Sequence, residues 1–149
     1  MKPPATTTTS KIQLEWWASP GVVYFFAAGN PAKAVKIGVT AIPKKATLLS
    51  AVIQRFKSIQ THNHEMVELL GVVEFSAGEM PTRDAEVLER ELHLRFSPLQ
   101  RFHRHTRGAE WFTPSDELLE YITKHSTRPE ALGLPRIIGR EPILRKEEA

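Results

Sequence analysis

Charged and titratable side chains gather in the second half of the chain, between residues 90 and 107. Five arginines lie in this stretch with three histidines among them, against the single acid Glu91. They predict a local positive surface, for which a solvated loop is the plain alternative. Glu89 and His93 are four residues apart, a spacing that places both side chains on one face of a helix. Such a pair can share a site, and an ordinary exposed helical pair has the same spacing.

The composition narrows the chemistry and the compartment. The chain has 149 residues, which suits one domain, and it contains no cysteine. Disulfides, thiolate nucleophiles and cysteine-bound zinc are thereby excluded. The net charge of +3 permits a nucleic-acid partner without requiring one. Because no apolar leader or membrane-length stretch is present, we expect a cytoplasmic protein without a membrane partner.

Apolar periodicity predicts three strands and three helices. Runs rich in β-branched and aromatic residues mark the strands, and apolar steps of three and four mark the helices. The first two strands form an antiparallel hairpin, which gives an α+β fold of order β-β-α-β-α-α, a three-stranded antiparallel sheet flanked by helices. Thr113 is expected to cap the last helix, with Pro114 in its first turn. The predicted strands are 22–28, 34–40 and 67–75, and the predicted helices are 48–59, 82–96 and 114–124.

The same patterns divide the chain into three parts. Residues 1–12 are rich in threonine and offer no apolar surface, so we expect them to be disordered. Residues 13–125 carry all the predicted elements and form the domain. Residues 126–149 are rich in proline, glycine and arginine and are expected to form an extended tail.

Several short motifs follow one another in a fixed order. Val22-Val23-Tyr24 and Lys36-Ile37-Gly38 lie on the two hairpin strands, Arg55 lies on the next helix, and Glu89 lies on a later one. This order resembles the GIY-YIG nuclease superfamily, which includes homing endonucleases and the incision subunit of nucleotide excision repair. The phage-type branch, with a meiotically up-regulated yeast gene product, is matched over residues 21–122. Its further strings are Arg55-Phe56-Lys57-Ser58-Ile59-Gln60-Thr61, Glu89-Arg90-Glu91-Leu92-His93 and Gly108-Ala109-Glu110-Trp111-Phe112.

The resemblance implies a metal-dependent endonuclease that hydrolyses phosphodiester bonds in DNA. Its partner is then single- or double-stranded DNA, and the protein is a monomer or a homodimer. Glu89 is the implied metal ligand, with Glu86 and Glu110 as substitutes. Glu110 is either a second acidic contributor or a polar residue that anchors its loop. Carboxylate and water ligands suit Mg²⁺ or Mn²⁺.

The implied catalytic residues divide the work of phosphodiester hydrolysis. Arg55 binds the phosphate through two hydrogen bonds. Tyr24 or Lys36 orients or deprotonates the attacking water, and either needs a depressed pKa to act as a base. The family has Tyr where this chain has Lys36, so the identity of the proton-handling group stays open. The substrate-binding candidates are Gly38, Lys57, His62, His93, Arg104 and Arg107.

Each of these residues also has a purely structural interpretation. A tyrosine in an aromatic strand, such as Tyr24, is typical of core packing. Lys36 is typical of a solvated strand residue, and Arg55 of a surface cation beside an apolar helix face. The alternative function is a non-catalytic nucleic-acid-binding module on the same fold, and a protein-interaction domain is a third possibility.

Overall fold

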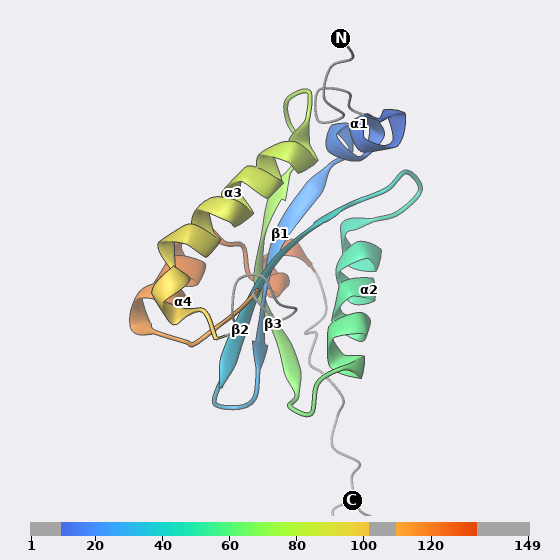
Figure 1. Cartoon of the computed structure of the whole chain (residues 1–149). Coiled ribbons are helices and arrows are strands. Elements are labelled where there is room, and N and C mark those ends of the chain that lie inside the picture. Colours follow the sequence, from blue (N-terminus) through green and yellow to red (C-terminus); the bar gives the residue numbers. More distant parts are fainter. Residues whose placement is uncertain (1–9, 102–109, 134–149) are drawn as a thin grey trace, which may run out of the picture.

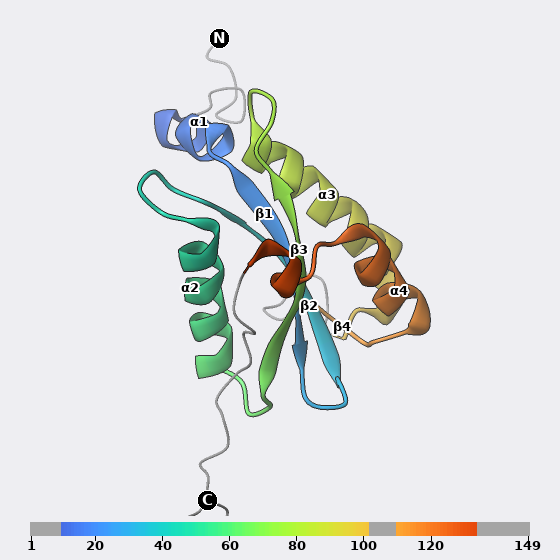
Figure 2. The ribbon, with the colours of Figure 1, turned by 180° about the vertical axis from the view of Figure 1, so that it is seen from behind.

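The computed structural model describes residues 10–101 and 110–133, which fold as an α+β unit. Four antiparallel strands form one sheet in the order β3-β1-β2-β4. Helix α2 covers one face of the sheet, and helices α3 and α4 cover the other (Figures 1 and 2). None of the helices in these two ranges combines the length and apolar character needed to cross a bilayer. The elements are α1 (Lys11–Ala18), β1 (Gly21–Ala28), β2 (Ala34–Ala41), α2 (Leu48–Thr61), β3 (Val67–Phe75), α3 (Pro81–Arg95), η2 (Ser97–Leu99), β4 (Trp111–Phe112), α4 (Asp116–His125) and η3 (Pro129–Leu132).

Strand β1 is the centre of the fold. All eight of its residues are buried, and it pairs with β2 on one side and β3 on the other. Because side chains alternate along a strand, Tyr24 and Phe26 point to the α2 face while Phe25 points to the opposite face. The first face packs against Val52 of α2, and the second packs against Leu92 of α3. The sheet thus separates two apolar clusters.

The predicted α+β class and hairpin are confirmed, but the predicted strand count of three is wrong. The fourth strand, β4, has only two residues and pairs with Val35 and Lys36 of β2. Two residues are too few for a periodic pattern, so local sequence gives no strand signal there. Its main effect is to hold Glu110, the residue before it, beside β2, where the Glu110 carbonyl accepts the Ile37 N–H at 3.0 Å.

Helix α1 is an element that periodicity did not predict, and it begins two residues before the predicted domain boundary. None of its residues is buried, so it has no apolar face of the kind that marks a core helix. It is attached through polar contacts instead. Trp16 and Trp17 donate hydrogen bonds to Glu86 of α3, and the Thr82 hydroxyl donates to the Ser19 carbonyl.

The cap of helix α4 lies two residues later than predicted. Ser115 occupies the N-cap, and its hydroxyl accepts the Leu118 N–H at 3.1 Å. Thr113, the predicted cap, instead donates its backbone N–H to the Leu99 carbonyl at 2.7 Å. Both Thr113 and Ser115 have the side chain of an N-cap residue, and the tertiary contact with Leu99 decides between them.

The described chain continues the fold beyond residue 125, where the sequence predicts an extended tail. Thr127 exchanges two backbone hydrogen bonds with Val72 of β3, at 2.8 and 3.0 Å. Gly71 makes this approach possible, because a side chain there would collide with Ser126 and lie 3.2 Å from the Thr127 carbonyl oxygen. Residues 1–9 and 134–149, which contain most of the predicted flexible ends, lie outside the described residues.

Candidate active site

Tyr24 and Gly38 form the floor of the candidate site. They are direct partners in the pairing of β1 with β2, and the Tyr24 side chain lies over Gly38. A Cβ atom on Gly38 would collide with the phenol oxygen and would lie 2.6 Å from Cε1 of Tyr24. Glycine is therefore required at position 38 by the tyrosine across from it, and the tyrosine is only 3% exposed.

Two carboxylates, those of Glu89 and Glu110, lie close enough to this pair and to each other to interact electrostatically. Burial raises the pKa of Glu89 to about 7, with a further contribution in the same direction from the Glu110 carboxylate. Arg90 and Lys36 act in the opposite direction. Among the described residues, no hydrogen bond or ion pair engages the Glu89 carboxylate. Glu89 is thus a half-buried acid that is close to half protonated at neutral pH.

The same carboxylates also shift the pKa of the Tyr24 phenol. Burial raises its pKa, Glu110 and Glu89 raise it further, and Arg55 opposes them. Interactions of this kind require proximity, so side chains from α2, from α3 and from the residue before β4 lie near the phenol of Tyr24 on β1. Tyr24 keeps its proton at neutral pH, which is the opposite of the depressed pKa expected for a base.

Lys36 belongs to the same cluster. It lies on β2 two residues before Gly38, hence on the same face of the sheet. Its ammonium group is 3.7 Å from the Glu110 carboxylate and 5.7 Å from the centre of the Trp111 ring. Lys36 therefore places a cation beside the two carboxylates.

Arg55 supplies a second cation from helix α2. The helix begins with a reciprocal cap in which Thr47 and Ser50 exchange hydrogen bonds at 2.9 and 3.0 Å. Arg55 is half-buried, and its guanidinium makes no hydrogen bond or ion pair with another described residue. Its five N–H donors are consequently available to an anionic ligand.

Glu86, the substitute metal ligand, is already engaged. Its two carboxylate oxygens accept the indole N–H groups of Trp16 and Trp17, at 3.3 and 3.1 Å. Glu89 and Glu110 remain as the pair of interacting carboxylates that could bind a metal ion. The described residues contain no group of three or more His, Asp or Glu side chains placed to hold a metal ion. Two mutually repelling carboxylates nevertheless form a donor set that suits a hard divalent cation completed by water.

Three of the other predicted substrate-binding residues, His93, His62 and Lys57, lie in the described part of the chain, and none of them is shown to contact the carboxylates, Arg55 or Tyr24. His93 Nε2 bonds the Ile37 carbonyl at 2.9 Å and its ring packs edge-on against Phe112, so it ties α3 to β2. His62 Nδ1 bonds the Ser58 carbonyl at 3.0 Å at the end of α2. Lys57 lies exposed along α2. Arg104 and Arg107 lie outside the described residues.

Comparisons with family models, with curated proteins and with solved structures found no match. The chemistry available to the cluster follows from its own groups. They are two interacting carboxylates, an ammonium group beside one of them, a protonated phenol and a guanidinium that pairs with no other described residue. The carboxylates suit a cation and the guanidinium suits an anion, which is the combination needed to bind a metal together with a phosphate.

Proposed function

We propose that this protein is a metal-dependent endonuclease of the GIY-YIG type that hydrolyses phosphodiester bonds in DNA. The observation that carries the proposal is the placement of the Tyr24 side chain over Gly38, with the charges of Arg55 and Glu89 both acting on its phenol. These residues are far apart in the sequence and come from three different elements. Their proximity at the Tyr24 phenol supports the catalytic assignment, because the motif resemblance requires these same residues in one pocket.

Phosphodiester hydrolysis needs a positioned water, neutralised phosphate oxygens and a stabilised leaving oxyanion. In the proposed enzyme, the free guanidinium of Arg55 binds the phosphate with two parallel hydrogen bonds. Lys36 adds a second positive charge from strand β2. Both charges are in place before the substrate binds, so neither has to be reorganised during the reaction.

Glu89 and Glu110 are the residues that would hold Mg²⁺ or Mn²⁺. A bound divalent ion supplies stabilisation of the negative charge that develops on the phosphate and the leaving oxygen. The raised pKa of Glu89 fits this assignment, because a buried carboxylate that repels its neighbour gains from a cation as it gains from a proton. Proton and cation therefore compete, and we expect cation binding to weaken below about pH 7.

The raised pKa of Tyr24 defines its part in the proposed reaction. A phenol that keeps its proton donates a hydrogen bond and does not deprotonate water. Tyr24 therefore orients the water or a phosphate oxygen.

The test is cleavage of labelled single-stranded and duplex DNA with Mg²⁺ or Mn²⁺. Glu89→Ala and Glu89→Gln are expected to lower the cleavage rate by at least about 100-fold, the range typical of a lost catalytic group. Glu91→Gln is the matched control, because Glu91 is exposed on the same helix. Salt-sensitive DNA binding without cleavage in either metal would contradict the proposal and favour the non-catalytic binding module.

A further inference from the structure

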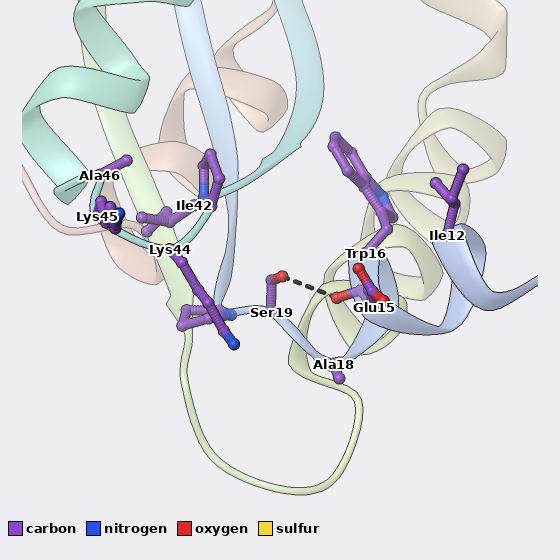
Figure 3. Close-up of a pocket in the computed structure, with 11 residues that line it drawn as sticks. Ile12, Glu15, Trp16, Ala18, Ser19, Ile42, Lys44, Lys45 and Ala46 are labelled. Carbon is purple, nitrogen blue, oxygen red and sulfur yellow. Dashed lines mark hydrogen bonds between the residues drawn. The ribbon is translucent and has the colours of Figure 1, made fainter.

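A groove of about 960 Å³ lies between helix α1 and the connection from β2 to α2. Ile12 and Trp16 form one wall, and Ile42, Lys44 and Lys45 form the other (Figure 3). The two walls are joined at the base of the groove, where the Ile42 N–H donates to the Pro20 carbonyl at 2.7 Å. The groove combines apolar surface with two lysines.

This groove continues to the candidate active site. A second depression of about 350 Å³ shares Trp16, Pro43 and Ala46 with the first, and Arg55 lines its far side. Arg55 is also the residue whose charge acts on Tyr24. A path along the surface therefore leads from helix α1, past Trp16, to the guanidinium that the proposed function assigns to phosphate binding.

Trp16 is held in place while part of its ring stays open. Its Nε1 donates to Glu86 at 3.3 Å, yet the residue is 38% exposed. The neighbouring Trp17 donates to the same carboxylate at 3.1 Å, which anchors α1 on α3. A fixed and partly exposed indole ring is the kind of platform on which an unpaired base stacks.

The charges along the path favour a polyanion. Lys44, Lys45 and Arg55 line it against the single acid Glu15, so the lining carries a net charge of +2, three cations minus one acid. Neither lysine makes an ion pair with another described residue. An apolar protein partner would have to bury these free charges, whereas a phosphate chain would pair with them.

We propose that this groove binds an unpaired DNA strand next to the phosphate held by Arg55, with a base stacked on Trp16 and phosphates beside Lys44 and Lys45. The inference rests on the proposed function, because Arg55 is the point where the groove meets the active site. A base in a duplex is stacked between its neighbours and cannot offer its face to an indole. The substrate is therefore DNA that is single-stranded on this side of the cleaved bond.

The test measures the Kd of the full chain, without metal, for an oligothymidylate of about 15 nucleotides and for a duplex of equal length. Trp16→Ala is expected to weaken single-strand binding about tenfold, and Trp16→Phe to retain most of it, since a phenyl ring also stacks. The double variant Lys44→Ala, Lys45→Ala is expected to reduce the slope of log Kd against log salt by about 1.4, roughly 0.7 for each phosphate contact. Duplex binding should change less in each case.

Matched controls separate the groove from general effects of the substitutions. Leu14→Ala removes an apolar side chain of α1 that is 42% exposed and does not line the groove, and Lys124→Ala removes a lysine of α4. Neither should change the Kd. Unchanged single-strand binding in a folded Trp16→Ala protein, or an equal loss for duplex and single strand, would overturn the inference and assign the groove to another occupant.

The outcomes also distinguish this inference from the proposed function. Metal-dependent cleavage with binding that does not depend on Trp16 would overturn the groove and leave the nuclease. Trp16-dependent binding of the single strand, with no cleavage in either metal, would support the groove and overturn the nuclease.

Discussion

Glu86 and Glu89 lie one turn apart on helix α3, and their surroundings are opposite. Glu86 accepts two indole N–H groups, at 3.1 and 3.3 Å, from helix α1. Glu89 interacts electrostatically with the Glu110 carboxylate and has no hydrogen bond or ion pair with any described residue. The first carboxylate fastens one element to another. The second is held in an unfavourable charge state that a cation or a proton would relieve.

Residue type and helical position therefore do not fix the role of a carboxylate. A carboxylate whose oxygens accept hydrogen bonds from protein donors is not available to bind a metal or transfer a proton. Burial beside a like charge instead raises the pKa of a carboxyl group and leaves it available. The donors around Glu86 come from a helix without a buried face, and the like charge near Glu89 comes from the residue before a two-residue strand. Both surroundings depend on the smallest elements of the fold.

The largest expected effect comes from adding a side chain at Gly38, where Tyr24 of β1 packs directly over β2. Gly38→Ala forces its Cβ against the Tyr24 ring, so we expect it to lower the free energy of unfolding by about 3 kcal/mol, measured by urea denaturation. Combining it with Tyr24→Ala frees that space. The double variant should then be more stable than the sum of the two single losses predicts, and simple additivity would contradict the contact.

Glu89→Gln should change how the free energy of unfolding depends on pH. The folded pKa of Glu89, about 7, lies above its ordinary value of 4.5, so the native protein loses stability as the pH rises from 4.5 through 7. Glutamine does not titrate. At pH 8 the variant should be more stable than the native protein by about 1 to 2 kcal/mol, after allowance for solvent screening of this half-buried group. Below pH 4.5 the difference should disappear, and a constant difference across this range would contradict the shift.

Glu86→Gln tests the other side of the comparison and should have the opposite sign. Replacing the carboxylate weakens two charge-assisted hydrogen bonds to Trp16 and Trp17, which we expect to lower the free energy of unfolding by about 1 kcal/mol at pH 8. Thermal or urea denaturation measures it, with Glu91→Gln as the exposed control on the same helix. An increase in the free energy of unfolding of Glu86→Gln would contradict the claim that Glu86, unlike Glu89, stabilises the fold.

Lys36→Ala should give the smallest change in stability, under about 0.5 kcal/mol, because its ion pair with Glu110 is long and partly exposed. Its effect should appear in the titration of Glu89 instead. Lys36 favours the charged form of that carboxyl, so its removal should raise the pKa of Glu89 further, as measured by NMR. Lys33→Ala, at an ion pair with Glu65 elsewhere on the surface, is the matched control. A lowered pKa of Glu89 would mean that Lys36 does not act on this site.

Periodicity predicted the large elements and missed the small ones. The strand 67–75 has the predicted bounds, and the helix predicted over residues 48–59 runs to Thr61. Both have many apolar residues in register with one buried face, so the pattern repeats often enough to be read. Helix α1 has no buried face and β4 has two residues, so neither repeats a pattern. These two elements supply Trp16 to the groove and hold Glu110 at the candidate site.

The continuous apolar run of β1, the hairpin, and the order of Tyr24, Arg55 and Glu89 along the chain could all be predicted from the sequence. Three features depend on tertiary contacts. Tyr24 lies over Gly38, Glu110 lies close enough to act on Glu89, and Glu86 accepts hydrogen bonds from two tryptophans. The physical reason is that periodicity is a local property of the backbone, whereas burial and Coulomb interactions depend on distances in space between residues far apart in the chain.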